Sequence, residues 1–183
     1  PSPSPDIATY RLAAAHARLR NDTAVYAVLS AIPDVGPCPA IPTKEDDMHG
    51  MLNDFPRGCT MVHVAATVPG ALDVIPTPVL AKHVHTLTSD GESLLLLAVK
   101  AGCATNVRRL CEAGADPNVP QASQDGKKDD RSPLMCAAFI NNIAIVEALL
   151  SAGADPTYRR THKHGQLDDQ STLDIACRNG HSE

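Results

Sequence analysis

The sequence predicts an all-α solenoid, a stack of helix-turn-helix units joined by extended loops. Three observations lead to this fold class. Ser93, Ser132 and Ser171 lie 39 residues apart, and a short apolar, Ala-containing run follows each of them. Gly114 and Gly153 are also 39 residues apart, each inside the run Ala-Gly-Ala-Asp-Pro. Apolar residues between these markers recur at the spacing of one helix face. A fixed period of this kind is typical of stacked repeats.

Each repeat is expected to begin with a short helix capped by its serine, because a hydroxyl accepts a hydrogen bond from an orphan N–H of the first turn. Pro133 follows Ser132 at the first helical position, where its missing N–H costs nothing. Alanines allow neighbouring helices to approach closely. The first helix should end at a Gly or Asn, which stands at positions 102, 141 and 180.

A second helix is expected in each complete repeat. Its buried face should carry Val107 and Leu110 in one repeat, and the apolar residues Val146, Leu149 and Leu150 in the next. Gly114 and Gly153 then supply the left-handed residue that ends this helix. The following Asp-Pro turns the chain into a loop.

These features resemble the ankyrin repeat, whose pattern combines Thr-Pro-Leu-His-x-Ala, Gly-His, a Val/Leu helix and Gly-Ala-Asp. Ala-Cys-Arg-Asn-Gly-His at 176–181 is close to it, and Cys-Thr-Met-Val-His-Val-Ala-Ala at 59–66 fits an earlier repeat. Three prolines interrupt the second helix of that earlier repeat, so a weaker helix is expected near Val79 to Leu87. Residues 8–35 resemble an N-terminal capping repeat.

The resemblance divides the chain into a Pro/Ser linker at 1–7, the capping repeat at 8–35, a long loop insertion at 36–57 and ankyrin repeats over 58–183. Four to five repeats are expected, with boundaries at 58–90, 91–129, 130–168 and a partial 169–183. The family's usual period is shorter than 39 residues, and the added residues fall in the loops 118–130 and 157–169. The resemblance implies that these two loops form β-hairpin fingers. If Leu173 and Ile175 were left uncovered, each would forfeit roughly 1.5–3 kcal/mol. We therefore expect the chain to continue past Glu183, or another element to cover this end.

Composition excludes several classes. The 183 residues carry 16 Lys and Arg against 21 Asp and Glu, a net charge of -5, with no Trp and few other aromatics. This disfavours direct nucleic-acid binding, which rests on basic surfaces and stacking platforms. The apolar runs are too short for membrane insertion. The six cysteines include no Cys-x-x-Cys and follow no secretory signal, so a reducing compartment, cytoplasmic or nuclear, is expected.

No catalytic residue, cofactor or metal site is predicted, since nucleotide-binding and hydrolase motifs are absent from the sequence. Weak combinations occur at His83 with His85, His162 with His164, Cys59 with His63, and Cys177 with His181. Most of them fall at surface or ordinary repeat positions. Acidic residues in equal register, at 90, 129–130 and 168–169, suit the positive ends of helices and would form a strip able to steer a basic partner.

The resemblance implies a binding scaffold that uses the concave face of the first helices and the finger tips. By register, the concave positions are Thr67, Val68, Lys100, Ala101, Phe139, Ile140, Arg178 and Asn179, and the helix starts add Cys59, Glu92, Arg131 and Gln170. The large apolar pair Phe139-Ile140 has two interpretations, a partner contact or extra core beneath the loop 118–130. The second finger also has two interpretations: either it binds an acidic or phosphorylated partner through Tyr158, Arg159 and Arg160, or its tip is simply solvated.

The sequence therefore predicts a non-catalytic protein–protein interaction module, a scaffold or adaptor, whose partner is another protein. Two alternatives remain open: a regulatory or substrate-recruiting domain of a larger enzyme or channel, and a structural subunit of a large assembly. The predicted partner-binding residues are Lys100, Arg131, Phe139, Ile140, Tyr158, Arg159, Arg160, Arg178 and Asn179.

Overall fold

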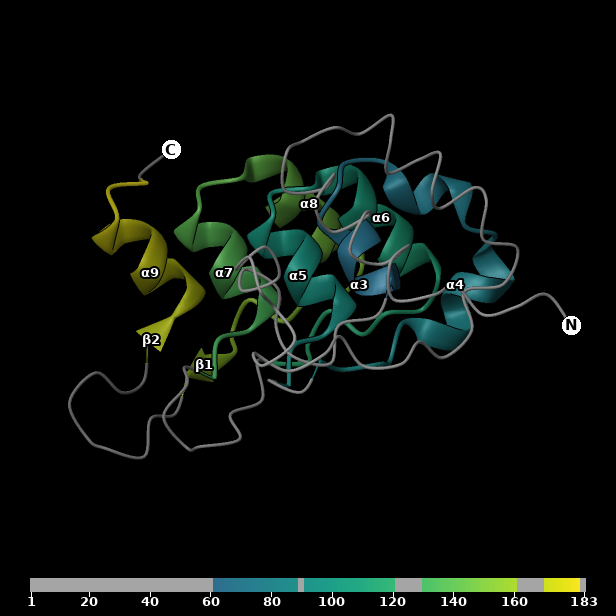
Figure 1. Ribbon diagram of the computed structural model, residues 1–183. Coiled ribbons are helices and arrows are strands. Elements are labelled where there is room, and N and C mark those ends of the chain that lie inside the picture. The colour runs from purple at the N-terminus through teal and green to yellow at the C-terminus, as the bar shows by residue number, and fades with distance from the viewer. Residues whose placement is uncertain (1–60, 89–90, 121–129, 161–169, 182–183) are drawn as a thin grey trace, which may run out of the picture.

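Two rows of short helices, stacked side by side, make up the computed structural model (Figure 1). It describes residues 61–88, 91–120, 130–160 and 170–181, so the predicted linker, capping repeat and 36–57 insertion lie outside the described residues. The elements are α3 (Met61–Ala66), the 3-10 helix η2 (Ala71–Val74), α4 (Thr77–His83), α5 (Leu94–Lys100), α6 (Ala104–Glu112), α7 (Pro133–Phe139), α8 (Ile143–Ser151), β1 (Arg159–Arg160), β2 (Gln170–Ser171) and α9 (Thr172–Arg178).

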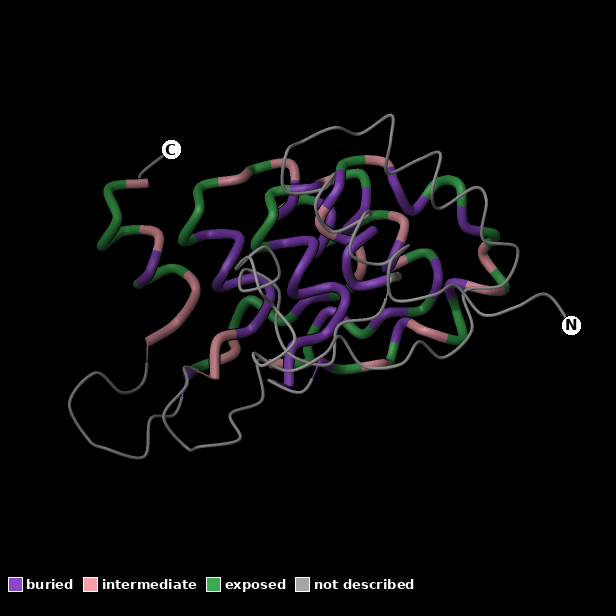
Figure 2. The backbone as a smooth tube through the Cα atoms, viewed as in Figure 1, coloured by how far each residue is buried: buried purple, intermediate pink, exposed green. Residues whose placement is uncertain are grey.

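The first helices of successive repeats form one row and the second helices the other. In the first row α3 packs on α5, α5 on α7, and α7 on α9; in the second, α6 packs on α8. The buried surface runs between the two rows (Figure 2). Neighbouring repeats thus pack on one another, as expected of a solenoid.

The predicted serine caps are confirmed. Ser93 accepts a hydrogen bond from the backbone N–H of Leu96 at 3.1 Å, and Ser132 accepts one from Met135 at 3.2 Å. Ser171 forms a full capping box: its hydroxyl oxygen accepts from the N–H of Asp174, and the Asp174 carboxylate accepts from the N–H of Ser171. The same local signal therefore starts three helices in register.

The predicted helix ends are confirmed as well. Asn141, which stands where the other repeats have Gly, is the one described non-glycine residue with a positive φ, 55°. Asn tolerates this left-handed conformation better than most residues, so it replaces the glycine with little strain. Gly114 adopts a φ of 94° at the end of α6.

The core is built from leucines of the first helices and from one face of each second helix. Val107, Leu110 and Leu149 are fully buried as predicted, but Leu150 is 44% exposed, so its assignment to the core was wrong. The buried face of α8 is set by Ile145, Ala148 and Leu149, and the next residue is turned by about 100° from that face. At the last repeat, Ile175 is 6% exposed and so is covered within the described structure, whereas Leu173 is 71% exposed.

The second half of the first repeat differs from the prediction. The expected helix near Val79 to Leu87 is instead α4, which begins at Thr77, because Pro78 lies in its first turn where no N–H is needed. The turn between α3 and η2 is held by the buried amide of Asn106 on α6. Its Nδ2 donates to the carbonyl oxygens of Ala65, Ala66 and Val68, and its Oδ1 accepts from the N–H of Gly70 at 3.0 Å.

The fingers are anchored on the stack at their bases. β1 and β2 pair antiparallel, with Arg159 opposite Ser171 and Arg160 opposite Gln170. This pairing agrees with the expected hairpin at 157–169, but the segments 121–129 and 161–169 lie outside the described residues. Asn118 links successive loops: its Nδ2 donates to the carbonyl of Gly153, and its Oδ1 accepts from the N–H of Asp155.

Candidate partner-binding face

Three predicted positions lie in one row at the ends of successive first helices. Lys100 ends α5, Phe139 ends α7 and Arg178 ends α9, each 39 residues from the next. These helices stand side by side (Figure 1), and all three residues are exposed. The row therefore presents a cation, an aromatic ring and a second cation to solvent.

The first repeat does not extend this row. Val68 is 2% exposed, and the Thr67 hydroxyl donates to the carbonyl oxygen of Val64 at 2.8 Å. Both were predicted as concave contact positions. The irregular turn held by Asn106 turns Val68 into the core, which leaves the accessible row to the later repeats.

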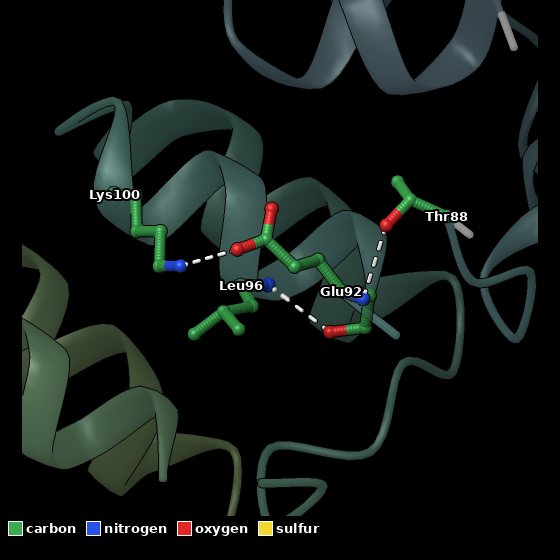
Figure 3. A network of polar contacts seen from close by, with 5 residues as sticks. Thr88, Glu92, Leu96 and Lys100 are labelled. Atoms are coloured by element: carbon green, nitrogen blue, oxygen red, sulfur yellow. Dashed lines mark hydrogen bonds and ion pairs between the residues drawn. The ribbon is translucent and has the colours of Figure 1, made fainter. Parts of the chain in front are cut away.

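The cation of Lys100 is paired within its own repeat. Its Nζ forms an ion pair and hydrogen bond with Glu92, whose side chain is only 9% exposed (Figure 3). The Glu92 N–H also donates to the Thr88 hydroxyl at 3.1 Å. Because a buried carboxylate needs a charged partner, Lys100 stabilises Glu92 and its own charge is largely neutralised.

The equivalent pair in the next repeat has different chemistry. Arg131 occupies the register position of Glu92, and Phe139 that of Lys100. The Arg131 guanidinium carbon lies 5.1 Å from the centroid of the Phe139 ring, within cation–π range. Phe139 is 49% exposed and Ile140 40% exposed. This exposure favours a partner contact over the alternative that the pair serves as extra core.

The pair at the end of α9 is polar. Arg178 and Asn179 are both exposed, and the Asn179 side chain donates to the carbonyl oxygen of Ile175 at 2.9 Å. Asn179 is thereby held against its own helix. Among the described residues, Arg178 forms no ion pair, in contrast to Lys100.

The finger residues have three different environments. Tyr158 is half-buried, and its hydroxyl donates to the carbonyl oxygen of Asp130 at 3.1 Å. Burial, with the Asp130 charge as a second cause, raises the pKa of Tyr158 above its ordinary value. Arg159 is exposed, but Arg160 is only 4% exposed, so the structure does not present it to a partner as predicted.

We expect Tyr158→Phe to lower the free energy of unfolding by about 1 kcal/mol, the usual contribution of one hydrogen bond. The change removes the bond to Asp130 and keeps the ring. Urea unfolding measures the loss. Ser151→Ala, at an exposed site at the end of α8, is the control for a general effect of mutation. Equal stability of Tyr158→Phe and wild type would contradict the proposed anchoring.

The described residues do not bring the weak chemical combinations together as sites. No group of three or more His, Cys, Asp or Glu able to hold a metal occurs among them. His63 is buried, and desolvation lowers its pKa to about 4, so it is neutral at pH 7. Its suggested partner Cys59 lies outside the described residues, as do the His162 pair and the proposed acidic strip except Asp130.

The fold is that of a helical repeat protein with a row of exposed residues at the ends of its first helices. The model of the ankyrin repeat family, in three copies, matches residues 62–160, more than half of the chain. The chain therefore belongs to the ankyrin repeat family, whose repeats are protein–protein interaction modules. Comparison with curated proteins gave no match. In the part of the chain that the structure describes, no helix combines the length and apolar character of a membrane span.

Proposed function

We propose that this chain is a non-catalytic scaffold or adaptor that binds another protein through the ends of its first helices. The contact face comprises Lys100, Arg131, Phe139, Ile140, Arg178 and Asn179, with Arg159 at the adjoining finger base. The single observation that carries the proposal is the exposed Phe139-Ile140 pair with Arg131 over the ring. Aromatic and Arg side chains are enriched among residues that dominate binding energy.

The finger loops form a second part of the proposed contact surface, with Tyr158 as a support rather than a contact. We place the protein in a reducing compartment, the cytoplasm or nucleus. No disulfide joins the four described cysteines to one another, which is compatible with this location.

A second candidate role, as the recruiting or structural part of a larger enzyme, channel or assembly, is favoured by a different surface. Ile143, Leu150 and Leu173 are 65%, 44% and 71% exposed. The first two lie on α8 and the third on α9, and exposed apolar side chains of this size are available for contact with another protein or domain. This role is compatible with the scaffold, because the two surfaces involve different residues.

We expect Phe139→Ala/Ile140→Ala to weaken binding of the native partner at least about tenfold, as removal of a central apolar contact does. The partner is isolated from the native cell by affinity purification and identified by mass spectrometry, and its affinity is then measured with purified protein. Val74→Ala is the matched control, since Val74 on η2 is 39% exposed, apolar, and belongs to neither proposed surface. Undiminished binding by the double variant, with an unchanged melting temperature, would contradict the proposed face.

A further inference from the structure

We propose that the partner segment is an extended acidic peptide with one central apolar side chain. The apolar side chain contacts Phe139 and Ile140, and flanking carboxylates contact Arg178 on one side and Lys100 on the other. This inference rests on the proposed function and specifies the chemistry of its ligand.

Charge complementarity is the first argument. The chain as a whole is acidic, with a net charge of -5, yet Lys100, Arg131 and Arg178 bring cations to this face. The carboxylates associated with α5 and α9 are both engaged within their own repeats. Glu92 is buried and bound to Lys100, and Asp174 accepts hydrogen bonds from the N–H and hydroxyl of Ser171. The exposed charged side chains at the ends of α5 and α9, Lys100 and Arg178, are therefore both cations, and Lys100 is offset by the buried Glu92.

The pairing of Arg131 with Phe139 is the second argument. The guanidinium lies over the ring at 5.1 Å and restricts it, while about half of the side chain stays exposed. A ring already held in place loses little freedom on binding. An apolar ligand side chain packed on Phe139 and Ile140 also excludes water from the neighbouring cations, which strengthens their attraction for carboxylates.

The repeat spacing determines where the carboxylates belong. Packed helices lie about 8–10 Å apart, and an extended chain advances about 3.3 Å per residue. One repeat therefore corresponds to about three residues of an extended ligand. A peptide that crosses α5, α7 and α9 meets the two cations with carboxylates about three residues before and after its apolar residue.

The two flanks are unequal. Lys100 already neutralises the buried Glu92, whereas Arg178 has no ion pair with a described residue. A carboxylate opposite Arg178 therefore gains more than one opposite Lys100. Loss of one ligand carboxylate is expected to weaken binding more on the Arg178 side.

The test uses short fluorescent peptides in a Gly/Ser background, each with a central Leu. One carries Glu about three residues to either side, a second carries Lys at both positions, and two more carry a single Glu. Fluorescence anisotropy measures their affinity for the wild type, for Arg178→Glu and for Arg108→Glu. Arg108 is an exposed arginine on α6, away from the row, and serves as the matched control.

The Glu peptide is expected to bind at least about tenfold more tightly than the Lys peptide at low salt, with the difference shrinking toward 1 M salt as the charges are screened. Arg178→Glu should abolish the preference, and Arg108→Glu should retain it. Equal affinity for the Glu and Lys peptides, no binding of any peptide, or equal effects of the two Arg variants would overturn the inference. If the native partner still depends on Phe139 and Ile140 in that case, the proposed function stands. If it does not, both fail.

Discussion

Replacing Asn106 by Leu is expected to lower the free energy of unfolding by about 3 kcal/mol or more. Asn106 is fully buried, and its amide satisfies three carbonyl oxygens and the N–H of Gly70. Leu has a similar size but makes none of these bonds. The carbonyl oxygens of Ala65 and Val68 keep backbone donors, the N–H groups of Val68 and Ala71. The loss therefore falls mainly on the Ala66 carbonyl and the Gly70 N–H, at about 1–3 kcal/mol for each. The turn that connects α3 to η2 should be the region most affected.

Urea unfolding followed by circular dichroism measures the loss for Asn106→Leu. Asn179→Leu is the control, because Asn179 is exposed and its side chain contacts only its own helix among the described residues. It should change stability by less than about 0.5 kcal/mol, as surface substitutions generally do. A loss below about 1 kcal/mol for Asn106→Leu would mean that the turn does not depend on this amide.

Lowering the pH from 7 to 5 is expected to destabilise the protein by about 2 kcal/mol through His63 alone. Burial, with the His83 charge adding in the same direction and a backbone bond at Thr86 opposing, lowers the pKa of His63 from 6.5 to about 4. Below pH 6.5 the unfolded chain binds a proton at this histidine while the folded protein does not. The contribution of neutral His63 to the free energy of unfolding is therefore fully present above pH 6.5 and is lost as the pH falls toward 4.

Thermal or urea unfolding across this pH range measures the effect. The variant His63→Gln should lose most of the pH dependence between 7 and 5, and His85→Gln, at an exposed site, should retain it. The lowered pKa values of Asp155 and Asp174 affect stability only at lower pH, since carboxylates begin to protonate near pH 4. An unchanged pH profile in His63→Gln would assign the dependence to another group.

Local signals made the later repeats predictable. The three serine caps and the left-handed residues at 102, 141 and 180 are read from short motifs, and the structure has them at those positions. The first repeat was harder, because its three prolines obscured where α4 begins. Asn106 was missed, although its register equivalent Ile145 is apolar and buried. A polar residue at a core position is the signal that was available.

Register predicted which residues lie in one row at the helix ends but not how they pair. Glu92 with Lys100 and Arg131 with Phe139 share one spacing, which the sequence displays without showing that the side chains meet. Successive side chains of a strand point to opposite sides, so Arg159 and Arg160 differ in exposure. Which of the two is buried depends on the tertiary packing around β1. Residue propensity and repeat spacing carry no information on that packing.

The pairs on the contact face have a consequence for how such a protein can change. Glu92–Lys100 and Arg131–Phe139 each form inside a single repeat, so each pair would remain intact if that repeat were duplicated or transplanted to another stack. Asn106 differs, because its partners belong to the preceding repeat. The two side-chain pairs can therefore be passed on with a single repeat, whereas the buried turn at α3 depends on two repeats being kept together.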